Sequence, residues 1–224
     1  MSPAGTRPLQ AAPAPRPDAA RLQAELDRLA ADIRACRLCR ESNIRPLPHE
    51  PSPVVVPSAT ARILIAGQAP GTRVHATGIP FNDRSGDRLR EWLGVGREDF
   101  YDGDKFAIVP MGFCFPGNDA HGGDLPPRRE CAPRWRAELL ALMPQVELVL
   151  AIGLYAQHWH LGEGKRRALT ETVAGWRAIH GEKRHPRVLP LPHPSWRNTG
   201  WLKRNPWFGE ELLPVLRAEI ARLT

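Results

Sequence analysis

The chain alternates short apolar runs with longer segments in which apolar residues recur every three or four positions. The runs have the length of buried strands and cover residues 62–66, 106–111, 146–152 and 187–191. Helical spacing predicts helices that begin at Asp18 and at Ser85, helices over 133–143, 169–179 and 206–223, and a short helix around 155–161. Strands that alternate with helices predict a three-layer α/β/α sandwich with a central, mostly parallel four-stranded sheet.

The segments outside this pattern set the domain boundaries. Residues 1–17 are rich in Pro and Ala without any period, which predicts a disordered tail, and residues 18–224 should form a single domain. Residues 45–57 contain five prolines and should form an extended connection. Pro214 should kink the last helix.

Composition favours a polyanionic partner. The net charge is +7 and the sequence pI is about 9.8, a balance that suits DNA, although an arginine-rich composition bias would produce it too. No apolar stretch approaches the roughly 20 residues of a membrane span, and the N-terminus lacks the apolar core of a signal peptide. We therefore expect a cytoplasmic protein whose commonest kind of polyanionic partner would be nucleic acid, and we expect it to be a monomer.

Unusual loops follow all four predicted strands, after Ala66, Met111, Ile152 and Leu191. In an open α/β sheet, ligands bind at the carboxyl ends of the strands, so these loops should meet at one site. The first loop begins with Gly67, Gln68 and Ala69. The amide of Gln68 can donate to and accept from a nucleobase, and the ring of Phe81 could stack on one. An ordinary strand-to-loop turn is the alternative.

Four cysteines form a second candidate site: Cys36, Cys39, Cys114 and Cys131. In a cytoplasmic chain such a set argues against disulfides, and four thiolates suit either zinc or a 4Fe–4S cluster. The alternative is four buried free cysteines that behave as small apolar residues.

In their order along the chain, these motifs resemble the uracil-DNA glycosylase superfamily, in particular its iron–sulfur branches. The matching motifs are Cys36-x-x-Cys39, Gly67-Gln-Ala-Pro-Gly71, Gly78-Ile-Pro-Phe81, Asp83-Arg-Ser-Gly86-Asp87, Cys114-x-Pro-Gly-Asn118, Cys131 and His193-Pro-Ser195. They cover nearly all of the chain after residue 36.

The resemblance implies a DNA glycosylase that acts in base excision repair by base flipping. It implies that the four cysteines hold a 4Fe–4S cluster with a structural role, that the Gly67–Gly71 loop holds the base and the attacking water, and that Phe81 is the stacking aromatic. Many members carry an acidic residue in the first motif or an Asn after the second strand, where this chain has Gln68 and Pro110-Met111. These departures argue against strict uracil specificity, and Asp83-x-Ser-Gly86 resembles the branch that lacks the acidic first motif and accepts several deaminated bases.

Cleavage of an N-glycosidic bond needs a group near the sugar cation and a donor to the leaving base. Asp83 is our candidate for the carboxylate, with helix capping as its alternative role and Asp87 or His75 as competitors. His193 is the candidate donor, unless it is a structural histidine in a turn. Asn82 and Gln68 could bind the base or the water, and His75 also lies in this region. Asn118 and His121 are weaker candidates.

DNA contacts are expected from the loop Ser195, Trp196, Arg197 and Asn198, whose aromatic and basic residues suit wedging into the stack. Trp196 could equally be a core residue. Lys165, Arg166, Arg167, Lys203 and Arg204 could contact phosphates or form a solvated basic surface. The leading hypothesis is a monofunctional glycosylase for uracil or related deaminated bases; the alternative is a non-catalytic DNA- or RNA-binding protein on the same fold. The basic charge argues against a small-molecule or nucleotide hydrolase.

Overall fold

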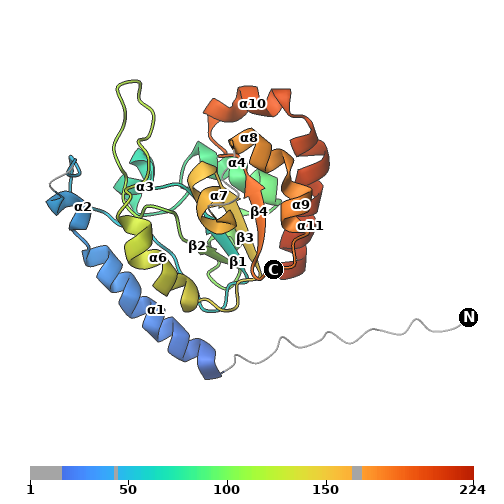
Figure 1. The fold of residues 1–224 in the computed structure, drawn as a ribbon. Coiled ribbons are helices and arrows are strands. Elements are labelled where there is room, and N and C mark those ends of the chain that lie inside the picture. Colours follow the sequence, from blue (N-terminus) through green and yellow to red (C-terminus); the bar gives the residue numbers. More distant parts are fainter. Residues whose placement is uncertain (1–16, 43–44, 163–167) are drawn as a thin grey trace, which may run out of the picture.

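A computed structural model describes residues 17–42, 45–162 and 168–224. Residues 1–16 of the predicted tail and the basic run Lys165, Arg166 and Arg167 lie outside the described residues. The core is a four-stranded sheet made of β1 (Ile63–Ala66), β2 (Phe106–Ile108), β3 (Leu148–Ile152) and β4 (Arg187–Leu191). The strand order is β2-β1-β3-β4, and all three pairings are parallel (Figure 1). The predicted α/β sheet is therefore confirmed.

The helices before β3 are α1 (Pro17–Ala35), α2 (Leu38–Glu41), α3 (Thr72–Thr77), α4 (Arg84–Leu93), α5 (Arg97–Tyr101) and α6 (Cys131–Ala141). Those after it are α7 (Leu154–Leu161), α8 (Leu169–Ala174), α9 (Trp176–His180), the 3₁₀ turn η2 (Trp196–Asn198), α10 (Thr199–Arg204), the π-helical turn η3 (Phe208–Leu212) and α11 (Leu213–Leu223). No described helix has both the length and the apolar character needed to cross a membrane.

The observed helices differ from the predicted ones in several places. α1 starts at Pro17 rather than Asp18, because proline suits the first turn of a helix. The helix predicted over 169–179 is two helices that meet at Gly175. In place of the predicted kink at Pro214, a π-helical turn immediately precedes α11, and this proline lies in the first turn of α11. The sequence analysis did not predict α2, α3, α5 or α10.

Helices cover both faces of the sheet because alternate strand residues point to opposite sides. Leu64 and Val149 face the layer formed by α1, α6 and α7 (Figure 1). Ile65 and Leu150 face the opposite layer, which contains α4 and α8 to α11. The two apolar clusters on either side of the sheet leave its strand ends as the place for polar chemistry.

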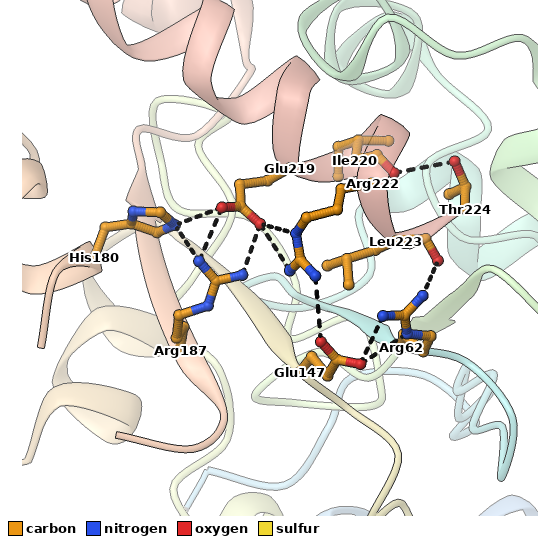
Figure 2. Close-up of polar contacts among 9 residues, drawn as sticks. All are labelled: Arg62, Glu147, His180, Arg187, Glu219, Ile220, Arg222, Leu223 and Thr224. Carbon is orange, nitrogen blue, oxygen red and sulfur yellow. Dashed lines mark hydrogen bonds and ion pairs between the residues drawn. The ribbon is translucent and has the colours of Figure 1, made fainter. Parts of the chain in front are cut away.

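An ion-pair network ties the C-terminal helix to the amino ends of the strands (Figure 2). Glu219 on α11 accepts two hydrogen bonds from Arg187 at the start of β4, at 2.8 and 2.6 Å, and another from Arg222 at 3.0 Å. Glu147 before β3 in turn pairs with Arg62 at 2.8 Å. The hydrogen bond from Arg187 is the main cause that lowers the pKa of Glu219 to about 2. This network stabilises the fold at the amino ends of the strands, whereas the candidate site lies at their carboxyl ends.

Candidate active site and cysteine cavity

The predicted site loops lie at the carboxyl ends of the parallel strands. β1 leads into Gly67, and β4 leads through Pro192 into His193. The two strands are not neighbours, because β3 lies between them. At the end of β3, Gly153 has a φ of +80° and a Cβ there would lie 4.0 Å from that of His193. The positive φ favours glycine here, whereas the 4.0 Å separation is an ordinary van der Waals contact that places the His193 loop beside the end of β3.

Phe81 is held in an uncommon backbone conformation, with a φ of +54°. Its carbonyl accepts a hydrogen bond from Arg90, and the Tyr101 hydroxyl donates to the preceding Pro80 carbonyl at 2.8 Å. A Cβ on Gly67 would lie 3.3 Å from the end of the Phe81 ring. The half-buried ring therefore lies beside the Gly67 turn, where stacking on a flat ligand was expected.

Asp83 caps α4: its Oδ1 accepts from the Gly86 backbone N–H at 2.9 Å. The capping role considered from the sequence is therefore present. The same carboxylate also acts electrostatically on His193, because its charge raises the pKa of that imidazole, although burial has the larger, lowering effect. The competing carboxylate, Asp87, pairs with Arg90 at 2.6 Å. Asp83 is the better placed of the two to act with His193.

Hydrogen bonds around His193 define which ring nitrogen carries its proton. The Ser195 backbone N–H donates to Nδ1 at 3.2 Å, so the neutral ring carries its proton on Nε2. Burial lowers the pKa of His193, so the ring is neutral at pH 7. Asn198 donates to the His193 carbonyl at 2.7 Å, and Arg88 on α4 donates to the Ser195 carbonyl at 3.0 Å. The loop therefore presents a neutral N–H donor.

A hairpin over residues 117–125 brings further polar residues to the site. Leu125 N–H donates to the Gly117 carbonyl, and Asn118 donates to the Asp124 carboxylate at 3.1 Å. A Cβ on Gly71 would lie 3.6 Å from Asp124 Oδ2, so this carboxylate faces the first motif. Burial raises the pKa of Asp124, and the charge of Asp83 acts in the same direction. Asp124 is thus a second carboxylate within electrostatic reach of the site.

The remaining base-contact candidates differ in their surroundings. The Gln68 amide N–H lies 3.4 Å from the Leu125 carbonyl, which places it against the hairpin. Asn82 accepts from Arg97 at 3.1 Å. His75 lies on α3, and the centre of its ring is 4.4 Å from that of His49. Burial lowers the pKa of His75. Ala69 lies in the turn after β1, and His121 is exposed and donates its backbone N–H to Asp119.

The expected wedge loop projects from the surface. Trp196 is 70% exposed, so it is not a core residue, and the guanidinium of Arg197 lies 5.1 Å from the centre of its ring. Arg197 also donates to the Gly122 carbonyl of the hairpin at 3.0 Å. Lys203 and Arg204 are exposed on α10, the helix that follows this loop. An exposed aromatic and several cations therefore border the strand ends.

The four cysteines line one small cavity. Cys36 follows α1, Cys39 lies in α2, Cys114 lies in the segment after β2, and Cys131 begins α6. All four are free thiols. Other residues that line the cavity include Pro51, Phe113, Arg128 and Trp135.

The thiols are close enough to influence one another. Burial raises the pKa of Cys114 and of Cys131 to about 12, and the charges of the other cysteines act in the same direction. Sγ of Cys131 accepts from the Phe113 backbone N–H at 3.4 Å. Within the described part of the chain, no three His, Cys, Asp or Glu side chains converge closely enough to hold a single metal ion. The thiols surround the cavity without meeting at one point.

Two residues of the site escaped the sequence analysis for a clear reason. Arg88 and Asp124 belong to no motif, and only the fold brings them to the His193 loop and to Gly71. The sequence offered one signal for Asp124: it lies in a polar, glycine-rich loop that follows a predicted strand, and such loops often carry functional residues.

The chain was also compared with known protein families. Residues 53–217 match the model of the uracil DNA glycosylase superfamily. This range spans well over half of the chain, includes the whole sheet, and contains Phe81, Asp83, His193 and the 117–125 hairpin. The chain therefore belongs to the uracil DNA glycosylase superfamily.

Proposed function

We propose that this protein is a monofunctional DNA glycosylase that hydrolyses the N-glycosidic bond of uracil or a related deaminated base in DNA. The observation that carries the proposal is the shared position of Phe81, Asp83 and His193 at the strand ends of a chain of this superfamily. A base in a duplex cannot reach such a site, so the enzyme has to flip the nucleotide out of the stack.

His193 is proposed to stabilise the leaving base. Its Nε2–H is a neutral donor, and negative charge builds on the base oxygen as the glycosidic bond breaks. Ser195, Asn198 and Arg88 hold the loop, so the donor is oriented before the substrate arrives. Phe81 is proposed to stack on the flipped base beside Gly67 and Gln68.

Carboxylate charge is proposed to stabilise the sugar cation or to orient the attacking water. Asp83 keeps one oxygen on the Gly86 N–H, which leaves the other for this role. Trp196 and Arg197 are proposed to fill the gap left by the flipped nucleotide, since both lie on the exposed loop after His193.

The cysteines are proposed to hold a 4Fe–4S cluster, with zinc as the alternative. Four thiols around one cavity are a suitable donor set for either group. Such a group would cross-link α1, α2, the segment after β2 and α6, and its role would be structural.

The test is a panel of oligonucleotides, single- and double-stranded, with uracil, hypoxanthine, xanthine or thymine opposite guanine at one position. The purified holoprotein should convert at least one of them to an abasic site, detected as strand cleavage after alkali. Tight binding to uracil-containing DNA without cleavage of any substrate would favour the non-catalytic alternative.

A further inference from the structure

Arg136 on α6 is a charged side chain with 0% exposure. Its Nη1 donates to the carbonyls of Val109 and Pro110, both at 2.9 Å, and its Nη2 lies 2.7 Å from His160 Nε2. His160 therefore accepts there, and burial holds the pKa of His160 well below its usual range. Arg136 Nε has no hydrogen-bond partner among the described residues. Burying a guanidinium in this way is costly unless a negative charge lies close by.

Carboxylates do not supply that charge within the described structure, where every hydrogen bond of Arg136 goes to a carbonyl or an imidazole. Arg136 follows Cys131 on the same helix, directly after the cavity-lining Trp135. Arg136 does not itself line the cavity, but its helix supplies two of the cavity residues, Cys131 and Trp135.

A second arginine lies in the wall itself. Arg128 lines the cavity together with Cys39, and its side chain lies within hydrogen-bonding reach of that thiol. Arg128 also pairs with Glu130 at 2.9 Å, so part of its charge is already balanced. Arg128 therefore places positive charge beside Cys39 in the wall, and Arg136 lies on the helix that begins with Cys131.

We propose that Arg136, assisted by Arg128, is the positive counter-charge of an anionic metal–thiolate centre held by the four cysteines. A zinc ion or an oxidised iron–sulfur core balances only part of the charge of four thiolates, so the loaded centre is an anion in a buried site. The inference rests on the proposed metal centre and assigns residues outside its ligand set. It explains why a fully buried arginine without a carboxylate partner is tolerated.

The experiment compares purified holoproteins of wild type, Arg136→Met, Arg136→Lys and Arg128→Met. Arg134→Met is the control, because Arg134 lies on the same helix but is exposed and stacks on Trp135 at 4.0 Å. The readouts are iron and zinc content, the rate of metal loss to a chelator, and the midpoint potential if iron is present. None of these readouts requires glycosylase activity.

Arg136→Met should speed metal loss by about 10–100-fold, as expected when a group behind the ligands is removed. If the centre is a cluster, its reduction should become harder, because the added electron loses a neighbouring positive charge. A tenfold change in the reduced-to-oxidised ratio corresponds to about 59 mV. Arg136→Lys keeps the charge but loses the planar fork, so it should lower thermal stability while retaining most of the chelator resistance.

Each other outcome counts against the inference in a distinct way. If wild type binds neither iron nor zinc, both the proposed metal centre and this inference are wrong. If wild type is metal-loaded and Arg136→Met resists the chelator like Arg134→Met, only the inference is wrong, and Arg136 serves simply to bond the β2 carbonyls. Should Arg136→Met fail to fold, the same comparison applies to Arg128→Met, which should show faster metal loss.

Discussion

Replacing Gly86 with alanine should displace the segment that carries the stacking residue. Gly86 lies in the first turn of α4, directly under Phe81. A Cβ at this position would lie 1.7 Å from the Phe81 carbonyl oxygen and 2.6 Å from its carbonyl carbon. Both are backbone atoms, so no side-chain rotation relieves the clash.

The size of the effect follows from these distances. Cβ contacts shorter than 3.0 Å essentially never occur, so Phe81 or α4 has to move by more than about 1 Å. Such overpacking should destabilise the fold by about 1–3 kcal/mol, against the ~1 kcal/mol that alanine gains over glycine within a helix. A misplacement of that size at a reacting site typically slows the reaction by about a hundredfold.

The assay combines thermal unfolding with single-turnover cleavage of the best substrate from the base panel. Gly209→Ala is the matched control, because a Cβ there would meet no atom within 4 Å. Gly86→Ala should unfold at a lower temperature and cleave slowly, whereas Gly209→Ala should do neither. If Gly86→Ala matches wild type in both measurements, Phe81 does not owe its position to Gly86 and the described geometry of the stacking segment is wrong.

Three further perturbations test other parts of the structure. The folded pKa of Glu219 is about 2 and its ordinary value 4.5, so its contribution is complete above about pH 4.5 and is lost as the pH falls toward 2. Urea unfolding of wild type should therefore lose about 2 kcal/mol from this group over that range, and Glu219→Gln, unlike the exposed Glu210→Gln, should remove that loss. Trp196→Ala should change stability by less than about 0.5 kcal/mol but weaken binding to abasic DNA by about 1–3 kcal/mol in fluorescence anisotropy; equal affinity would exclude a wedge role. Cys114→Ser should lose bound metal and melt at a lower temperature, since a site formed only in the folded chain adds its binding energy to folding; unchanged metal content would remove Cys114 from the ligand set.

Periodicity predicted the sheet well because its strands are continuous apolar runs with both faces covered. β4 runs from Arg187 to Leu191 as expected, whereas β2 ends at Ile108, three residues before the predicted Met111. Backbone pairing nevertheless continues there, since Met111 N–H donates to the Gly67 carbonyl at 2.9 Å. The short helices α2, α3, α5 and α10 were missed because four to six residues are too few to show a period.

The site was only partly predictable for a different reason. Motifs that combine turn-forming residues with polar side chains directly after a strand, such as Gly67-Gln68 and His193-Pro-Ser195, could be found from the sequence alone. Asp83 illustrates the limit, because the same residue caps α4 and acts on His193, and the spacing that predicts the first role conceals the second. The role of Arg136 could not be predicted from the sequence, because an arginine within a helix is usually an exposed cation. Only the packing of α6 against β2 and α7 shows that this side chain is buried.

The most direct test of the account is the single-turnover rate of base release by wild type and by His193→Ala on uracil-containing DNA. The account predicts measurable release by wild type and a rate about a hundred- to a thousandfold lower for His193→Ala, because a pre-oriented N–H donor to the leaving base is lost. Binding of both proteins to undamaged DNA should be the same. An unchanged rate in His193→Ala would contradict the account and place the chemistry elsewhere on the chain.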